Sequence, residues 1–78
     1  MSLIVVKATY DPEARVWCVE HSDIPGVNAE ASTLDELIEK LPAVIADLLE
    51  DEGVAGEREL PVEVIAHAHT RVKLRTVA

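Results

Sequence analysis

Two periods in the arrangement of apolar and polar residues divide this chain into elements. Residues 3–10 and 15–21 are rich in β-branched and apolar side chains, and residues 27–31 and 60–69 alternate between apolar and polar positions, so these four stretches predict strands. From residue 34 to about residue 51, apolar residues recur every three or four positions and predict one amphipathic helix. The order ββ-β-α-β predicts an α+β domain, with one helix on a mainly antiparallel sheet.

The turn before the third predicted strand has strong local signals. Pro25 fixes its own φ angle, and Gly26 is able to take the positive φ of a type II turn. Asp23, which opens the turn, is a residue type that commonly forms hydrogen bonds to nearby backbone amides. We therefore expect Asp23, Pro25 and Gly26 to form a structural turn.

The helix has recognisable signals at both ends. Thr33 and Glu36 predict a capping box, in which the Thr33 hydroxyl accepts from the Glu36 amide and the Glu36 carboxylate accepts from the Thr33 amide. Gly53 predicts a left-handed helix end, followed by a loop over residues 54–59. Pro42 removes one helical hydrogen bond and predicts a bend. Two shorter helices meeting at Leu41 and Pro42 are the alternative, although the apolar spacing continues across Pro42.

The first two strands are joined by a predicted turn at residues 11–14, and the second strand carries Trp17, its largest side chain. In the last strand, Val64 and Ile65 are predicted to lie on opposite faces. The alternation continues in residues 70–78 and predicts an extension of this strand. One side of the extension carries Arg71, Lys73 and Arg75, and the other carries Val72 and Leu74.

Seventy-eight residues predict a single domain, residues 1–78, with a small core made almost entirely of aliphatic residues. Small domains usually need a disulfide, a metal or another chain for stability. Cys18 is the only cysteine, which argues against an internal disulfide and a structural zinc site. Another chain is the remaining support, so we expect an oligomer or a permanent partner.

The faces of the predicted sheet give a second reason to expect a homodimer. One helix covers only one face, yet Val16 lies opposite Trp17 and Val64 lies opposite Ile65, so Trp17 and Ile65 are candidate interface residues. Unpaired strand edges add a further surface that needs a partner. A two-fold dimer solves both problems, either by pairing of sheet edges or by face-to-face packing. The alternative is a monomer, in which polar residues such as Lys7 and Glu63 keep one face hydrated.

The formal net charge of −8, from 15 acidic and 7 basic residues, argues against direct binding of nucleic acid. The predicted helix has an acidic face that is either simply hydrated or a docking surface for a basic protein, with Asp35 and Glu39 as candidate contacts. The basic residues Arg71 and Lys73 are candidates for pairing with the acidic surface of a second copy. No stretch is long enough to span a membrane, and the absence of a leader together with the lone thiol favours the cytoplasm.

Several side chains raise the question of catalysis or metal binding. A nuclease site needs converging carboxylates, and the candidates are Asp11, Glu20, Asp23 and Glu30. Their positions in turns and on hydrated strand faces favour structural or surface roles instead.

His67 and His69 share one strand face, where His21 or Glu63 would be a third metal ligand, but histidines of this kind more often line a polar sheet face. Cys18 is predicted to be a buried, unreactive thiol. We therefore expect no catalytic residues, no cofactor and no bound metal.

These motifs together resemble the short HicB-like domains of bacteria and archaea, and in particular an uncharacterised family of stand-alone domains of this length. The resemblance covers nearly the whole chain. It rests on the Trp17 strand and on four segments: DIPG at 23–26, TLDEL at 33–37, LP-x-x-I-x-x-LL at 41–49, and LPVE at 60–63.

The resemblance implies a partial ribonuclease H-like fold. HicB proteins are antitoxins that bind the small basic HicA toxin, a ribonuclease, and cover its active site. Full-length HicB proteins usually carry a C-terminal DNA-binding module, for which we expect no room after His69. The leading hypothesis is therefore a non-enzymatic module that occludes a small basic ribonuclease toxin. The alternative is a stand-alone structural or regulatory homo-oligomer without a toxin partner.

Overall fold

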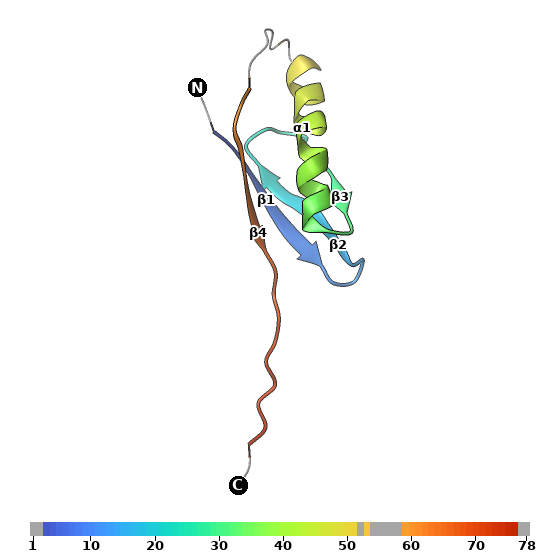
Figure 1. The fold of residues 1–78 in the computed structure, drawn as a ribbon, viewed down its shortest axis with the longest axis vertical. Coiled ribbons are helices and arrows are strands. Elements are labelled where there is room, and N and C mark those ends of the chain that lie inside the picture. Colours follow the sequence, from blue (N-terminus) through green and yellow to red (C-terminus); the bar gives the residue numbers. More distant parts are fainter. Residues whose placement is uncertain (1–2, 52, 54–58, 77–78) are drawn as a thin grey trace.

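The computed structural model describes residues 3–51, 53 and 59–76, which form four strands and one helix (Figure 1). The elements in chain order are β1 (Ile4–Asp11), β2 (Val16–Ser22), β3 (Glu30–Ala31), α1 (Leu34–Asp51) and β4 (Val62–His67). The sheet order is β3-β2-β1-β4. Its β1–β2 and β2–β3 pairs are antiparallel, and β4 runs parallel to β1. The predicted α+β fold with one helix on a mainly antiparallel sheet is confirmed.

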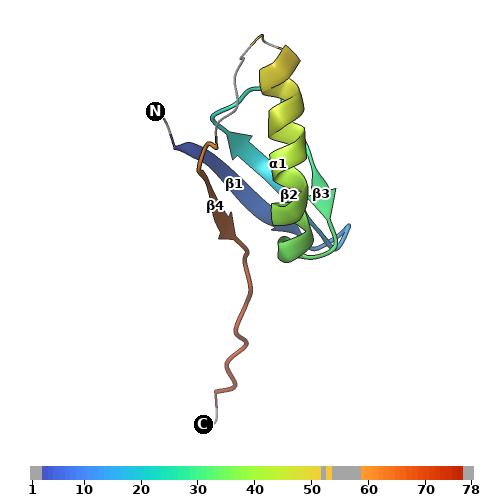
Figure 2. The ribbon, with the colours of Figure 1, turned by 45° about the horizontal axis from the view of Figure 1, so that its top comes forward.

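The helix α1 lies across one face of the sheet, and the core is the layer between them (Figure 2). Ile4, Val6 and Ala8 of β1 are buried in this layer because side chains two residues apart point to the same face. The facing side chains of α1 are Leu37, Leu41 and Ile45, and all three are buried.

No element of the described chain covers the opposite face of the sheet, which we call the open face. Residues paired across neighbouring strands share a face, so Lys7, His21 and Ile65 lie together on this open side. On β4, Val62 and Val64 pack against the core, whereas Glu63 is exposed and Ile65 is 43% exposed. The prediction that Val64 and Ile65 lie on opposite faces of the last strand is therefore confirmed.

The turn at residues 23–26 contacts both the sheet and the helix. Asp23 is bound twice to β1: its Oδ2 accepts from the Val5 amide at 2.9 Å, and its own amide donates to the Val5 carbonyl at 3.1 Å. Gly26 has the expected positive φ, at 89°. A Cβ at Gly26 would lie 3.5 Å from Leu48 Cδ2, so the turn also approaches the helix.

The helix start has one half of the predicted capping box. The Thr33 Oγ1 accepts from the Glu36 amide at 3.1 Å, as expected. The Glu36 carboxylate, however, accepts from the Ser32 hydroxyl at 3.3 Å, and in the described part of the chain it makes no bond to the Thr33 amide. The Ser32 hydroxyl, and not the Thr33 amide, is therefore the hydrogen-bond donor to the Glu36 carboxylate.

The helix is continuous from Leu34 to Asp51, so the alternative of two shorter helices is wrong. Pro42 is exposed, and the apolar stripe runs through it. Beyond the helix, Gly53 has a φ of 80° and donates to the Glu50 carbonyl at 3.0 Å, which confirms the left-handed end. Of the predicted loop 54–59, residues 54–58 lie outside the described residues.

Two strands are shorter than predicted, and one predicted extension is not a strand. β3 contains only Glu30 and Ala31. Val27 and Ala29 pack against the core, and the Ala29 carbonyl accepts a single hydrogen bond from the Val19 amide at 3.3 Å. β4 begins after Pro61, whose nitrogen has no hydrogen to donate, and ends at His67 beside Thr9. β1 ends two residues later, so residues 70–76 have no neighbouring strand in the described chain.

Leu41 tests the buried face of the helix. Its side chain is 1% exposed, so Leu41→Ala should lower the free energy of unfolding by about 2 to 5 kcal/mol. Leu41→Met keeps the volume nearly constant and should cost under about 1.5 kcal/mol. Urea denaturation at one fixed protein concentration measures both. Equal small losses would contradict the burial described here.

Thr33 tests the helix cap. Thr33→Ala removes the acceptor of the Glu36 amide and should lower the free energy of unfolding by about 1 kcal/mol. Thr33→Ser keeps the hydroxyl and should remain close to the original stability. An unchanged midpoint for the alanine variant in thermal denaturation would show that this bond does not stabilise the helix.

Candidate interaction surfaces

The four carboxylates considered for a nuclease site have separate surroundings. Asp11 holds the β1–β2 turn, where its Oδ1 accepts from the Glu13 amide at 3.0 Å, and Asp23 binds the Val5 amide. Glu20 pairs with His67, and the backbone carbonyl of Glu30 accepts from Lys40. Within residues 3–51, 53 and 59–76, no three His, Cys, Asp or Glu side chains are grouped to hold a metal ion.

The open sheet face carries an ion pair that bridges over β1. Glu20 on β2 and His67 on β4 stand on either side of β1, with Oε1 and Nε2 2.6 Å apart. His69 lies next to His67, with ring centroids 5.8 Å apart and an edge-to-face arrangement. The prediction that His67 and His69 share a face is confirmed. The Glu20–His67 pair was not predicted, because finding it requires knowing that β2 and β4 both flank β1.

The charge of Glu20 is stabilised by its surroundings. The hydrogen bond from His67 lowers the pKa of the Glu20 carboxyl. Desolvation opposes this shift, and the charges of His67, Lys7 and His21 add to the lowering. Both partners of the pair are nearly half exposed, so solvent screens the interaction and it contributes little to stability.

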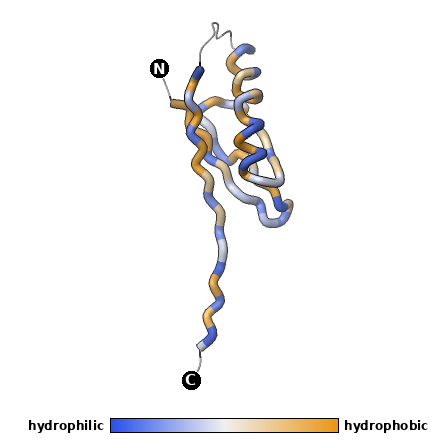
Figure 3. Tube along the Cα trace, in the orientation of Figure 1, coloured by the Kyte–Doolittle hydropathy of each residue, from blue (hydrophilic) through white to orange (hydrophobic). Residues whose placement is uncertain are grey.

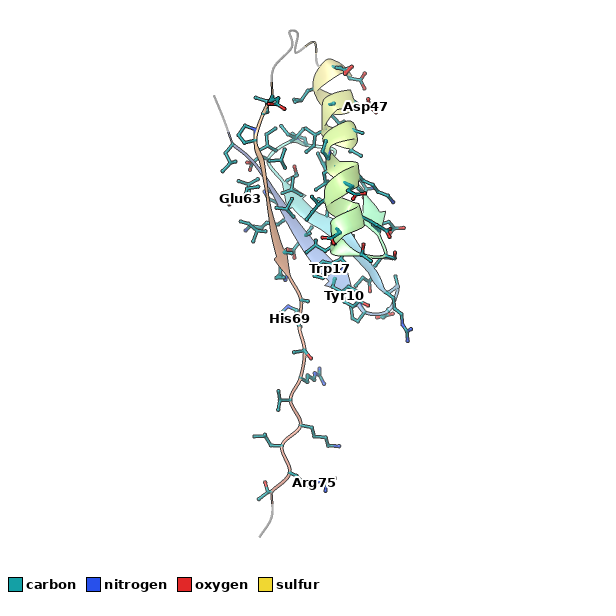
Figure 4. All side chains as sticks on the ribbon, in the orientation of Figure 1. Tyr10, Trp17, Asp47, Glu63, His69 and Arg75 are labelled. Atoms are coloured by element: carbon teal, nitrogen blue, oxygen red, sulfur yellow. The ribbon has the colours of Figure 1, made fainter. Side chains whose placement is uncertain are left out.

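The outer face of α1 is acidic. Asp47 points away from the sheet in Figure 4. The predicted contacts Asp35 and Glu39 are exposed on the same helix, and the full exposed acidic set is Asp35, Glu36, Glu39, Asp47, Glu50 and Asp51. The one basic residue of the helix, Lys40, donates to the Glu30 carbonyl at 2.8 Å, which draws its ammonium toward β3. The acidic face is therefore almost free of compensating charge.

The remaining predicted interface residues lie in separate places. Trp17 is half-buried on the helix side of the sheet, 5.4 Å from the Tyr10 ring, and packs against the buried cluster that contains Leu37. Ile65 lies on the open face, and Arg71 and Lys73 lie beyond the end of β4 at His67. The six predicted interface residues thus do not form one continuous surface.

An apolar groove, which the sequence did not reveal, lies between α1 and β4. It has a volume of about 400 Å³, and its lining residues are Ile4, Pro42, Ile45, Ala46, Leu49, Leu60 and Val62. The exposed Pro42 and Ala46 form the helix side of its rim. One feature of the sequence is consistent with this groove: apolar residues at 38, 42, 46 and 49 make the apolar stripe of the helix wider than the part that the sheet covers.

Residues 68–76 form an extended tail that leaves the domain in line with β4 (Figures 1 and 2). The tail accounts for much of the 67 Å length of a molecule that is only 24 Å by 19 Å in cross-section. Val72 and Leu74 are 81% and 85% exposed. Hydrophobic and hydrophilic residues alternate along the tail, as Figure 3 shows.

Cys18 lies on the open side of β2. It is half-buried rather than buried as predicted, because no layer covers this face of the described sheet. Its Sγ is 3.7 Å from the Thr9 carbonyl oxygen.

A bilayer-spanning helix is not found in the described residues, since none of their helical windows combines the required length with the required apolar character. The cytoplasmic location stays a prediction.

Comparison with known proteins gives two matches over nearly the whole chain. A family model described as "Domain of unknown function (DUF1902)" matches residues 3–76. The structure also resembles the crystal structure of a hypothetical protein from the extremely thermophilic bacterium Thermus thermophilus, with a TM-score of 0.66. The two sequences are 42% identical, and the match covers 94% of this chain and 100% of that one. None of the curated proteins matches the sequence. These matches do not name HicB, so the HicB resemblance stays a prediction.

The Glu20–His67 pair gives a pH-dependent test. Carbon NMR of the Glu20 carboxyl should give a titration midpoint below the ordinary glutamate value, and His67→Asn should raise that midpoint. Because the folded-state pKa is lowered, the small stabilisation is complete above the unfolded-state pKa and is lost as the pH falls through the folded-state value. His69→Asn is the control and should leave the Glu20 midpoint low. No response to His67→Asn would contradict the pair.

Proposed function

We propose that this chain, which belongs to the DUF1902 family, is a protein-binding module that acts as HicB antitoxins do, by covering the active site of a small basic ribonuclease. The observation that carries the proposal is the exposed acidic face of α1. The module would inhibit the ribonuclease by its shape and charge alone, without catalysing a reaction.

Charge complementarity supports this choice of partner. A ribonuclease that grips RNA must present lysine and arginine side chains to the phosphates. Six exposed acidic side chains along α1 match such a surface, and Lys40 is turned toward the Glu30 carbonyl. Opposite charges of this kind accelerate association and select the correct partner.

The rigidity of the acidic face also supports the proposal. Leu37, Leu41 and Ile45 anchor α1 to the sheet, and the Thr33 hydroxyl caps its first turn. The carboxylates therefore stand on a fixed element, and binding need not order a flexible segment first. Less entropy is lost on association than with a disordered acidic tail.

A stand-alone homo-oligomer is the second candidate function. The specific observation that favours it is the exposed tail, whose alternating residues have no partner in the described chain. The tail and the acidic face are different surfaces, so self-association alone does not decide between the two candidate functions.

The decisive experiment starts from the reading frame beside this gene. A small basic protein encoded there should inhibit growth when expressed alone, and co-expression of this chain should restore growth. The purified basic protein should cleave RNA, and this chain should inhibit the cleavage. Binding should weaken as ionic strength rises, because salt screens exposed charges. Lack of a basic neighbour, or cleavage that continues at saturating concentrations of this chain, would contradict the antitoxin role.

Variants of the helix locate the binding surface. Asp35→Asn with Glu39→Gln removes two charges while keeping similar shapes, and it should weaken binding about tenfold or more. Glu13→Gln with Glu59→Gln removes two exposed charges outside the helix and should leave the affinity nearly unchanged. Isothermal titration calorimetry measures both double variants. Equal effects would show that only net charge, and not the face of α1, matters.

A further inference from the structure

We propose that residues 70–76 act as a strand that pairs antiparallel with the outer edge of β4 in a second copy of this chain. In this arrangement Val72 and Leu74 of each copy fill the apolar groove between α1 and β4 of the other. The proposal concerns self-association and does not depend on the antitoxin role.

The receiving surface is the outer edge of β4. In the sheet order β3-β2-β1-β4, β4 pairs with β1 on one side, and no strand of the described chain pairs with it on the other. The backbone groups along that edge of Val62–His67 are therefore available to a further strand.

The groove beside this edge completes the receiving surface. Val62 and Leu60 line it from the β4 side, and Pro42 and Ala46 line it from α1. Ile38, one turn before Pro42 on the same helical stripe, is 41% exposed. A strand added at β4 would lie beneath this stripe, so its helix-side residues would be shielded from water.

The tail has the residues that such a strand requires. Its alternation continues that of β4, so Val72 and Leu74 fall on the same face as Val62 and Val64. Antiparallel registers that are centred near residue 68 and keep the two faces therefore place Val72 and Leu74 beside apolar residues within 60–66. Exposures of 81% and 85% make them the most exposed large hydrophobic residues of the described chain.

Charge complementarity favours the same pairing. Residues 71–78 carry three basic residues and no acidic one, whereas all 15 acidic residues precede them. If the tail is extended as a strand, the two-residue alternation places Arg71, Lys73 and Arg75 on the same face as Glu63, which is exposed on β4. Every face-preserving antiparallel register centred near residue 68 brings one of these three cations beside Glu63.

The occupant of the groove is a second copy rather than the chain's own tail. Folding back would require a tight turn between β4 and the tail, yet residues 68–71 contain no Gly, Pro or Asn. The backbone there is extended in both views (Figures 1 and 2). Two copies related by a two-fold axis each give a tail and receive one. Residues 62–76 of both chains then form one antiparallel ribbon of about 50 Å.

Sedimentation equilibrium of the full chain tests the proposal. The original protein should be a dimer, and Val72→Asp with Leu74→Asp should weaken the dimer at least about a hundredfold, since two apolar side chains per copy lose their burial. Val72→Ile with Leu74→Met keeps the apolar character and should leave a dimer. Asn28→Asp with Ala43→Asp adds the same charge at other exposed sites and should also leave a dimer.

If the variant with Val72→Asp and Leu74→Asp does not fold, a second test exchanges the charges of Glu63 and the tail. Glu63→Lys alone should weaken the dimer, and so should the triple change Arg71→Glu, Lys73→Glu and Arg75→Glu. The two sets combined should restore it. Circular dichroism monitors folding throughout. A monomer at every concentration of the original protein, a dimer unaffected by all tail variants, or no recovery in the combined variant would overturn the proposal.

Discussion

The contact between α1 and β1 is the constraint on which the rest of this small molecule depends. Leu37, Leu41 and Ile45 pack against Ile4, Val6 and Ala8, and these aliphatic side chains make up most of the buried core. The turn at residues 23–26 and the Thr33 cap fix where the helix begins and how it lies on the sheet. Because a single helix covers one face only, the same contact that stabilises the core also leaves a sheet face and the edge of β4 open. The candidate interaction surfaces are therefore consequences of the minimal core.

Local features could be predicted from the sequence, because neighbouring residues determine them. The positive φ angles of Gly26 and Gly53 and the Thr33 cap depend only on nearby backbone and side chains. The face of α1 that is buried followed from apolar spacing. The capping box was only half right, since the choice of Glu36 between Ser32 and the Thr33 amide depends on side-chain geometry that a motif does not encode.

Features that depend on which strands are neighbours could not be predicted. The Glu20–His67 pair requires β2 and β4 to flank β1, and the parallel placement of β4 is set by packing over long sequence distances. The groove beside Pro42 likewise requires α1 to lie toward β4. The tail is the reverse case: its alternation is typical of a strand, but a strand needs a neighbour, and the described chain supplies none beyond His67. The alternation in the tail was read correctly, but it does not reveal which strand the tail would pair with.

The geometry of a paired tail connects the two surfaces. Strands that add edge to edge about a two-fold axis perpendicular to the sheet keep both helices on the same side of one continuous sheet. The acidic faces of both α1 helices then point in the same direction, and the pairing through β4 leaves Asp35 and Glu39 uncovered. A partner that is itself two-fold symmetric, or that carries two basic sites, would engage both helices at once. The second contact would then form within an existing complex at high effective concentration, so modest attraction at each helix would add up to tight binding.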